Sequence, residues 1–288
     1  MKKMVFMIIV VCMLAACTST PNPNVGPELQ VVIPPLFSPS PDIPDDTIGI
    51  SITVKHPVGI RNWDITIQPI RTRPQSEQPP QGQRQRRIFF EHKGNGTPPA
   101  VWKWDGKSTS RASEMVQSAT DYQFVLSVND IFNNNSVYEG VIAVDVIVRR
   151  DGDKLRMVVP AITFQGDSSN FTRVAGDLTE DAINRNTRVL RMISNALSKY
   201  PGYNITIEGH ANPLAAQGTP ERIRQEAIYK PLSEQRARAV GEYLATNHNI
   251  ARTRFSYAGM GTSRTVVGFN EPEDEKWKNR RVEFILER

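Results

Sequence analysis

The spacing of apolar residues changes at about residue 150, and this change constrains the fold more than any other feature. Before it, short runs alternate apolar side chains with polar or small ones, as in 48–54, 63–67 and 124–128. A period of two is typical of half-buried strands, and several short strands of this kind favour a sandwich of two sheets. The sequence therefore predicts an all-β domain over 47–150.

After this point the apolar residues recur at helical spacing in two segments, 181–200 and 232–247, with Ser233 as the expected N-cap of the second. The expected strands are 158–164, 205–209, 255–258 and 281–286. The order βαβαββ predicts an α/β sandwich over 151–288, with one mixed sheet and both helices on one face.

The chain begins with a short basic leader and an apolar stretch, 4–14, that ends in Leu-Ala-Ala-Cys at 14–17. The stretch is too short to span a bilayer, which takes about 20 residues, and it fits a secretory signal peptide. The four residues resemble the lipobox of bacterial lipoproteins. This resemblance implies a signal peptide over 1–16 and lipidation of Cys17. Because Thr18 follows, it also implies a location at the cell outer membrane, facing the periplasm.

Composition limits the remaining choices. The chain contains two cysteines, Cys12 and Cys17, so the mature protein is expected to have no disulfide. Its formal net charge of +5 is too small to argue for a nucleic-acid partner. Residues 17–46 are rich in proline and polar side chains and are expected to form an extended tether. No pattern points to a metal or a cofactor.

The all-β region carries a set of aromatic and turn residues in a fixed order. They are Trp63-x-Ile-x-Ile, Gly96-x-Pro-Pro, Trp102-x-Trp104-Asp105-Gly106 and Asp121-Tyr122. This order resembles the Ig-like module of the flagellar hook-capping protein FlgD. The resemblance implies an immunoglobulin-like sandwich in which Trp104 packs between the sheets, and it leaves room for an envelope protein as a partner.

Four motifs in the last 130 or so residues occur in a family-specific order. They are Ile-Glu-Gly-His-Ala-Asn at 207–212, Leu-Ser-Glu-Gln-Arg-Ala at 232–237, Gly-Met-Gly-Thr-Ser at 259–263 and Asn-Arg-Arg-Val-Glu at 279–283. Together they resemble the OmpA-like domain of OmpA, Pal and MotB, in a version similar to that of spirochaete lipoproteins. The resemblance implies a protein that binds peptidoglycan, through the diamino acid of its stem peptide, without cleaving it.

The resemblance also implies which residues form the binding site. Arg236 is expected to donate to the carboxylate of the diamino acid, because a guanidinium pairs well with a carboxylate. The family strand ends in Gly-His-Thr-Asp, whose Asp accepts the ammonium, but Ala211 and Asn212 replace its last two residues here. Asp167 is a candidate to supply the lost negative charge, and Arg281 is a further candidate for the site.

Two alternatives remain open at this point. The chain is either a tether between the outer membrane and the cell wall, or an envelope scaffold whose peptidoglycan binding is weakened or lost because of Asn212. An enzyme is not expected, because no nucleophile with a base, pair of catalytic carboxylates or metal cluster is evident. His210 is expected to be a hydrogen-bonding spacer, and the insert 213–231 covers either the site or a partner surface.

Overall fold

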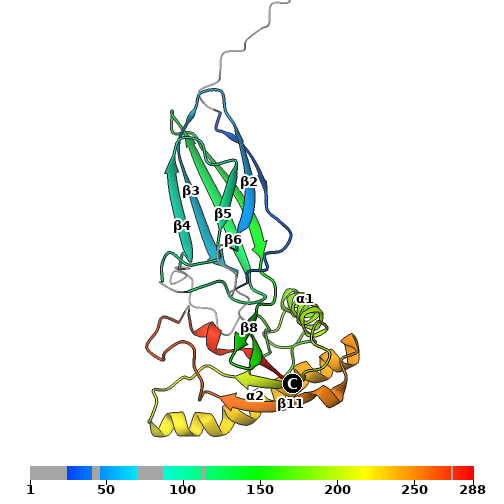
Figure 1. Ribbon diagram of the computed structural model, residues 1–288. Coiled ribbons are helices and arrows are strands. Elements are labelled where there is room, and N and C mark those ends of the chain that lie inside the picture. The colour runs from blue at the N-terminus through cyan, green and yellow to red at the C-terminus, as the bar shows by residue number, and fades with distance from the viewer. Residues whose placement is uncertain (1–24, 41–45, 71–86, 112–113, 274) are drawn as a thin grey trace, which may run out of the picture.

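The computed structural model describes the chain as two stacked parts, an elongated β-sheet part and an α/β part (Figure 1). The described residues are 25–40, 46–70, 87–111, 114–273 and 275–288. The predicted signal peptide and Cys17 lie outside them. Within these ranges no helix is both long and apolar enough to cross a membrane.

The first part contains two antiparallel sheets. The smaller sheet has the order β1-β2-β5, and the larger has the order β4-β3-β6-β7. The strands are β1 (Glu28–Val32), β2 (Ile48–Lys55), β3 (Ile60–Pro69), β4 (Phe90–Asn95), β5 (Val101–Trp104), β6 (Asp121–Asp130) and β7 (Asn135–Ala143).

One apolar core joins these two sheets, because alternate side chains of each strand point inward. Trp104 and Tyr122 are almost fully buried in it, as expected for Trp104. The Tyr122 hydroxyl also accepts a hydrogen bond of 2.8 Å from the backbone N–H of Gln117. The two-sheet arrangement agrees with the predicted sandwich, and its assignment to the immunoglobulin class stays a prediction.

Two strands, β1 and β8, belong to other parts of the chain than the predicted domain boundaries gave. Residues 28–32, expected in the tether 17–46, form β1 and pair with β2 from Glu28 opposite Lys55 to Val32 opposite Ser51. The segment is apolar enough to cover that edge of the sheet, with Leu29 and Val31 packed against the core. Strand β8 (Val148–Asp151) crosses the predicted boundary at 150 and pairs with the α/β sheet.

The α/β part has a mixed sheet, as predicted, in the order β11-β10-β12-β9-β8. Strand β10 is parallel to β11 and antiparallel to β12, and β12 is antiparallel to β9. The elements not yet given are β9 (Lys154–Val159), α1 (Glu180–Leu197), β10 (Asn204–His210), α2 (Pro220–His248), β11 (Phe255–Gly261), β12 (Val282–Glu287) and the 3-10 helices η2 (Arg252–Arg254) and η3 (Lys276–Asn279).

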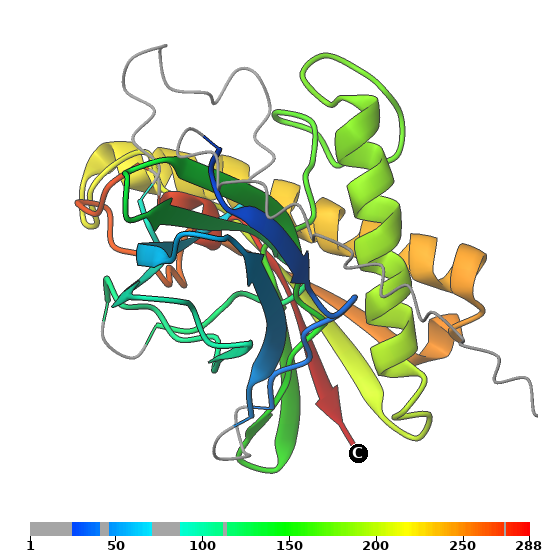
Figure 2. The same cartoon turned by 90° about the horizontal axis from the view of Figure 1, so that it is seen from above.

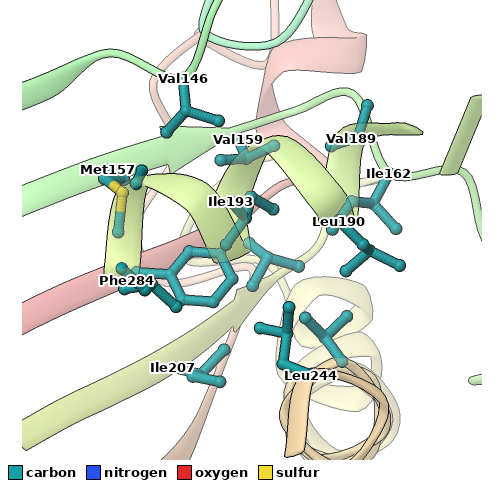
Figure 3. Close-up of a cluster of buried hydrophobic side chains, with 14 of the residues drawn as sticks. Val146, Met157, Val159, Ile162, Val189, Leu190, Ile193, Ile207, Leu244 and Phe284 are labelled. Carbon is teal, nitrogen blue, oxygen red and sulfur yellow. The ribbon is translucent and has the colours of Figure 1, made fainter. Parts of the chain in front are cut away.

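Both helices pack into one core with the strands. Leu190 and Ile193 of α1 meet Leu244 of α2, Ile207 of β10 and Phe284 of β12 (Figure 3). In the view from above, α2 passes behind α1 (Figure 2), and the two helices are in contact. This core holds α1, α2 and the end of β10 in fixed relative positions.

Helix α2 starts 12 residues earlier than predicted, at Pro220 instead of Leu232, and therefore includes most of the insert 213–231. Thr219 caps it by accepting from the backbone N–H of Arg222, and Pro220 suits the first turn, where an N–H has no helical partner. The predicted N-cap, Ser233, lies inside the helix, where its hydroxyl donates to the Lys230 carbonyl at 2.8 Å. Pro231 does not interrupt the helix, although its position favoured a break.

Candidate functional site

Glycines bring helix α2 directly onto the ends of β10 and β11. A Cβ at Gly209 would lie 1.9 Å from the Ser233 carbonyl oxygen, and one at Gly259 would lie 2.1 Å from that of Lys230. The Ser233 hydroxyl then accepts from the backbone N–H of Gly261 at 2.9 Å. These glycines of the family motifs therefore have a structural role: they allow the close approach that sets Arg236 beside the end of β10.

All five predicted site residues line one cavity of about 440 Å³. They are Asp167, Ala211, Asn212, Arg236 and Arg281. The cavity lies where the end of β10, helices α1 and α2, the segment after β9 and η3 meet. The sequence motifs thus predicted residues that the fold brings together at one cavity.

Three contacts with residues in the described ranges hold the guanidinium of Arg236 against this cavity. Its Nε donates to the Ser168 carbonyl at 2.9 Å, and its Nη2 donates to the Gln165 carbonyl at 3.3 Å. Its Cζ lies 5.0 Å from the centre of the Phe164 ring, within cation–π range. A guanidinium fixed in this way loses little freedom on binding an anion.

Asn212 is buried and already has a structural partner. Its Oδ1 accepts from Asn279 Nδ2 at 2.9 Å, and Asn279 Oδ1 in turn accepts from the backbone N–H groups of Val266 and Val267. The neighbouring Ala211 is fixed through its backbone, whose N–H donates to the Gly261 carbonyl at 2.7 Å. Asn212 therefore ties the end of β10 to the segment before β12.

Asp167 lies in the turn that follows β9. Its side chain is exposed and its backbone has a φ of 49°, in the left-handed region that Asp tolerates better than most residues. It lines the same cavity as Asn212, so it remains a candidate to supply negative charge.

Arg281 lies in a buried ion pair. Its Nε and Nη2 both lie 2.6 Å from Glu283 Oε1, and its Nη1 and Nη2 donate to the carbonyls of Asn279 and Arg264. Burial lowers the pKa of Arg281, and the charge of Glu283 partly offsets this effect. Arg281 therefore stabilises the fold of the strand end besides lining the cavity.

His210 was expected to be a hydrogen-bonding spacer, and this expectation is wrong. Its ring is buried, and neither ring nitrogen makes a hydrogen bond with any residue in the described ranges. Nε2 lies 3.6 Å from Glu208 and 3.5 Å from Glu283, which are opposite each other on β10 and β12. This distance is too long for a hydrogen bond. The pKa of Glu208 is lowered, first by His210 and then by the charge of Arg264, against the effect of burial.

Glu208, His210 and Glu283 have the residue types and proximity of a metal site. Their carboxylates, however, are already paired with cations. Glu283 Oε2 lies 2.6 Å from Arg156 Nη1, and both oxygens of Glu208 lie 3.2 Å from Arg264 Nη1. Divalent metal ions compete poorly for carboxylates neutralised by guanidinium groups, so this cluster is best understood as a buried ion-pair network.

The sandwich contributes one wall of the cavity, which the sequence did not indicate. The contributing residues are Ile70, Ala119, Thr120 and Asp121, around the end of β3 and the start of β6. Asp121 forms an ion pair with Arg188 of α1, so this wall is bonded to the α/β domain.

A ring of four alternating charges holds the two domains together beside the cavity. Arg87 lies 2.7 Å from Glu114 and 2.9 Å from Glu275, and Lys278 contacts Glu275 at 2.6 Å and Glu114 as well. Arg87 and Glu114 belong to the sandwich, and Glu275 and Lys278 belong to the segment around η3. Burial opposes the ionisation of Glu275, but Lys278 and Arg87 outweigh it, so the pKa of Glu275 is lowered.

Comparison with known proteins agrees with the motifs. Residues 164–280 match the model of the OmpA family. Outer membrane porin F of Pseudomonas aeruginosa is 31% identical over 98 residues, which are 34% of this chain and 25% of the porin. The peptidoglycan-binding protein ArfA of Mycobacterium bovis is 29% identical over 98 residues, 34% of this chain and 27% of ArfA. The C-terminal part of the chain is therefore an OmpA-like domain, as predicted.

The chain matches only about a quarter of the length of these curated relatives. Among solved structures, an outer membrane protein of Borrelia burgdorferi is 22% identical, with 48% of this chain and 94% of that chain covered and a TM-score of 0.31. A score this low supports no argument about the arrangement of the whole chain.

Proposed function

We propose that this protein binds peptidoglycan without cleaving it, through the cavity beside the end of β10. The observation that carries the proposal is the position of Arg236, whose guanidinium is fixed by two carbonyls and Phe164 at a cavity that Asn212 also lines. The match of this domain to the OmpA family, and its similarity to the peptidoglycan-binding protein ArfA, support the same conclusion.

The ligand in this proposal is the diamino acid of the stem peptide. A zwitterion of this kind needs a cation for its carboxylate and an acceptor for its ammonium. Arg236 supplies the first. Asn212 offers an amide oxygen in place of a carboxylate, and Asp167 adds negative charge at the same cavity.

In this proposal the protein is also a lipoprotein of the outer membrane that faces the periplasm. Its anchor is a lipid on Cys17, as the lipobox-like sequence implies. Stable attachment takes at least two anchoring signals, and the lipid chains of a bacterial lipoprotein meet this need. The result is a tether between membrane and wall, in which the sandwich is also available to an envelope protein partner.

The test is co-sedimentation of the purified mature chain with peptidoglycan sacculi. Arg236→Ala is expected to lower the apparent affinity about tenfold to a hundredfold, the usual cost of losing hydrogen bonds to a charged group. Arg238→Ala is the matched control, because Arg238 lies on the same helix and pairs with Glu234 at the surface. Asn212→Asp keeps an acceptor for Asn279 and is expected to raise the affinity.

The alternative is an envelope scaffold that no longer binds the wall. The bond between Asn212 and Asn279 favours it, since this bond gives Asn212 a structural reason to be present. If the wild-type chain and Arg236→Ala both stay in solution with sacculi, the scaffold is supported and the tether is rejected. If Arg236→Ala and Arg238→Ala bind sacculi with equal affinity, the chain still binds the wall, but Arg236 is not part of the binding site.

A further inference from the structure

Two arginines of α1, Arg185 and Arg188, line the same cavity as Arg236 of α2. Arg188 is paired with Asp121 of the sandwich. Arg185 also lines the cavity, and its Nε is buried without a hydrogen-bond partner among the described residues. Its terminal nitrogens make no hydrogen bond or ion pair with any other residue that the structure describes. An arginine in such surroundings lacks the anion that normally compensates its burial.

The electrostatics around Arg185 lead to the same conclusion. Burial lowers the pKa of Arg185, and the more distant charges of Asp181 and Asp121 offset this effect only in part, while Arg188 adds to it. A ligand anion beside Arg185 would remove this penalty. Among the described residues that line the cavity, arginines also outnumber acidic side chains.

We propose that Arg185 forms a second anion subsite, which binds a carboxylate of the stem peptide other than the one bound by Arg236. This proposal rests on the proposed function and specifies its ligand further. A stem peptide that contains diaminopimelate carries a carboxylate on this diamino acid and another at its C-terminal end. The Nε edge of a guanidinium offers two parallel N–H donors, which match the two oxygens of a carboxylate.

The cavity is large enough for both carboxylates to be bound at once. At about 440 Å³ it lies within the range of sites that enclose ligands of several hundred daltons. Arg185 comes from α1 and Arg236 from α2, two helices that share one core and so keep their spacing. The sandwich closes the side of the cavity next to Arg185 with Thr120 and Asp121. The inference therefore gives the sandwich a part in ligand binding.

Calorimetric titration with two peptides tests the subsite. The probes are a soluble stem tetrapeptide that contains diaminopimelate and has a free C-terminal carboxylate, and the C-terminal amide of the same peptide. The wild type is expected to bind the free acid at least tenfold more tightly than the amide.

Variants assign this preference to a residue. Arg185→Gln is expected to reduce the ratio of the two affinities to near one while amide binding stays nearly unchanged. Arg185→Lys, which keeps the charge but loses the two-donor edge, should give an intermediate ratio. Arg191→Gln is the matched control, because Arg191 lies on the same helix and is exposed, and it should keep the wild-type ratio. Thermal unfolding of each variant verifies its fold.

The possible results separate this inference from the proposed function. Equal wild-type affinities for acid and amide, or an unchanged ratio in Arg185→Gln, would overturn the subsite. If Arg236→Ala still lowers the affinity for both peptides in that case, the proposed function stands. If the wild type binds neither peptide nor sacculi, both proposals fail.

Discussion

The charge of Glu275 is expected to hold the two domains together. Its side chain is almost fully buried, 2.6 Å from Lys278 and 2.9 Å from Arg87. Removing one partner of a buried ion pair costs about 3–5 kcal/mol. Because Glu114 would still pair with both cations after Glu275→Gln, we expect a smaller loss of about 2 kcal/mol in the free energy of unfolding.

Differential scanning calorimetry measures this effect. For a chain of this size, about 2 kcal/mol corresponds to a fall of about 4–8 °C in Tm. The matched control is Glu242→Gln, because Glu242 forms a single exposed ion pair with Arg252 and should contribute less than about 1 kcal/mol. Equal Tm values for Glu275→Gln and the control at pH 7 would show that the ring does not hold the domains.

The pH dependence gives a second check on Glu275. Its pKa in the folded chain is lowered, so its contribution to stability is present above its unfolded pKa and is lost as the pH falls through the folded pKa. The difference between the wild type and Glu275→Gln should therefore be complete at neutral pH and shrink in acid. A difference that is the same at neutral and strongly acidic pH would contradict the electrostatic explanation.

Three further substitutions test the framework of the site by urea denaturation. Gly209→Ala should cost more than about 3 kcal/mol or prevent folding, since its Cβ would lie 1.9 Å from the Ser233 carbonyl oxygen; a near-native midpoint would contradict this packing. Asn279→Ala should cost about 2–3 kcal/mol by removing the partner of Asn212, with faster amide exchange in 264–281, and unchanged exchange would argue against the link. Leu190→Ala should cost about 2–5 kcal/mol, because Leu190 is fully buried between the helices and the sheet, and a loss below 1 kcal/mol would place it outside the core.

The sequence predicted the mixed sheet and the cavity residues because these depend on local pattern. The position of Arg236 follows from its motif on α2, and Asn212 follows from its place at the end of a strand. Both elements are then brought together by glycines such as Gly209, whose spacing is visible in the sequence. The sequence can therefore predict which residues meet at a site when these residues lie on, or at the end of, a helix or strand.

Other features depend on contacts that leave no local signal. Pro231 favoured a helix break, but the packing of α2 against β11 keeps the helix continuous through it. Glu114 lies between strands and Lys278 lies in the short helix η3, 164 residues further along the chain, and no periodicity connects them. The ion-pair ring and the wall formed by Asp121 appear only when the two domains are docked.

The replacement at 212 explains why this docking matters for the site. Asn279 needs an acceptor at 212, and an amide oxygen satisfies it as well as a carboxylate would, so the structural bond survives without the charge. Asn279 also ends η3, whose Lys278 joins the ring to the sandwich, so Asn212 is linked through η3 to the domain interface. Because the charge is absent at 212, negative charge for an ammonium has to come from elsewhere in the cavity. Asp167, which lines the same cavity, is the candidate for this charge, whereas Asp121, brought there by the sandwich, is already paired with Arg188.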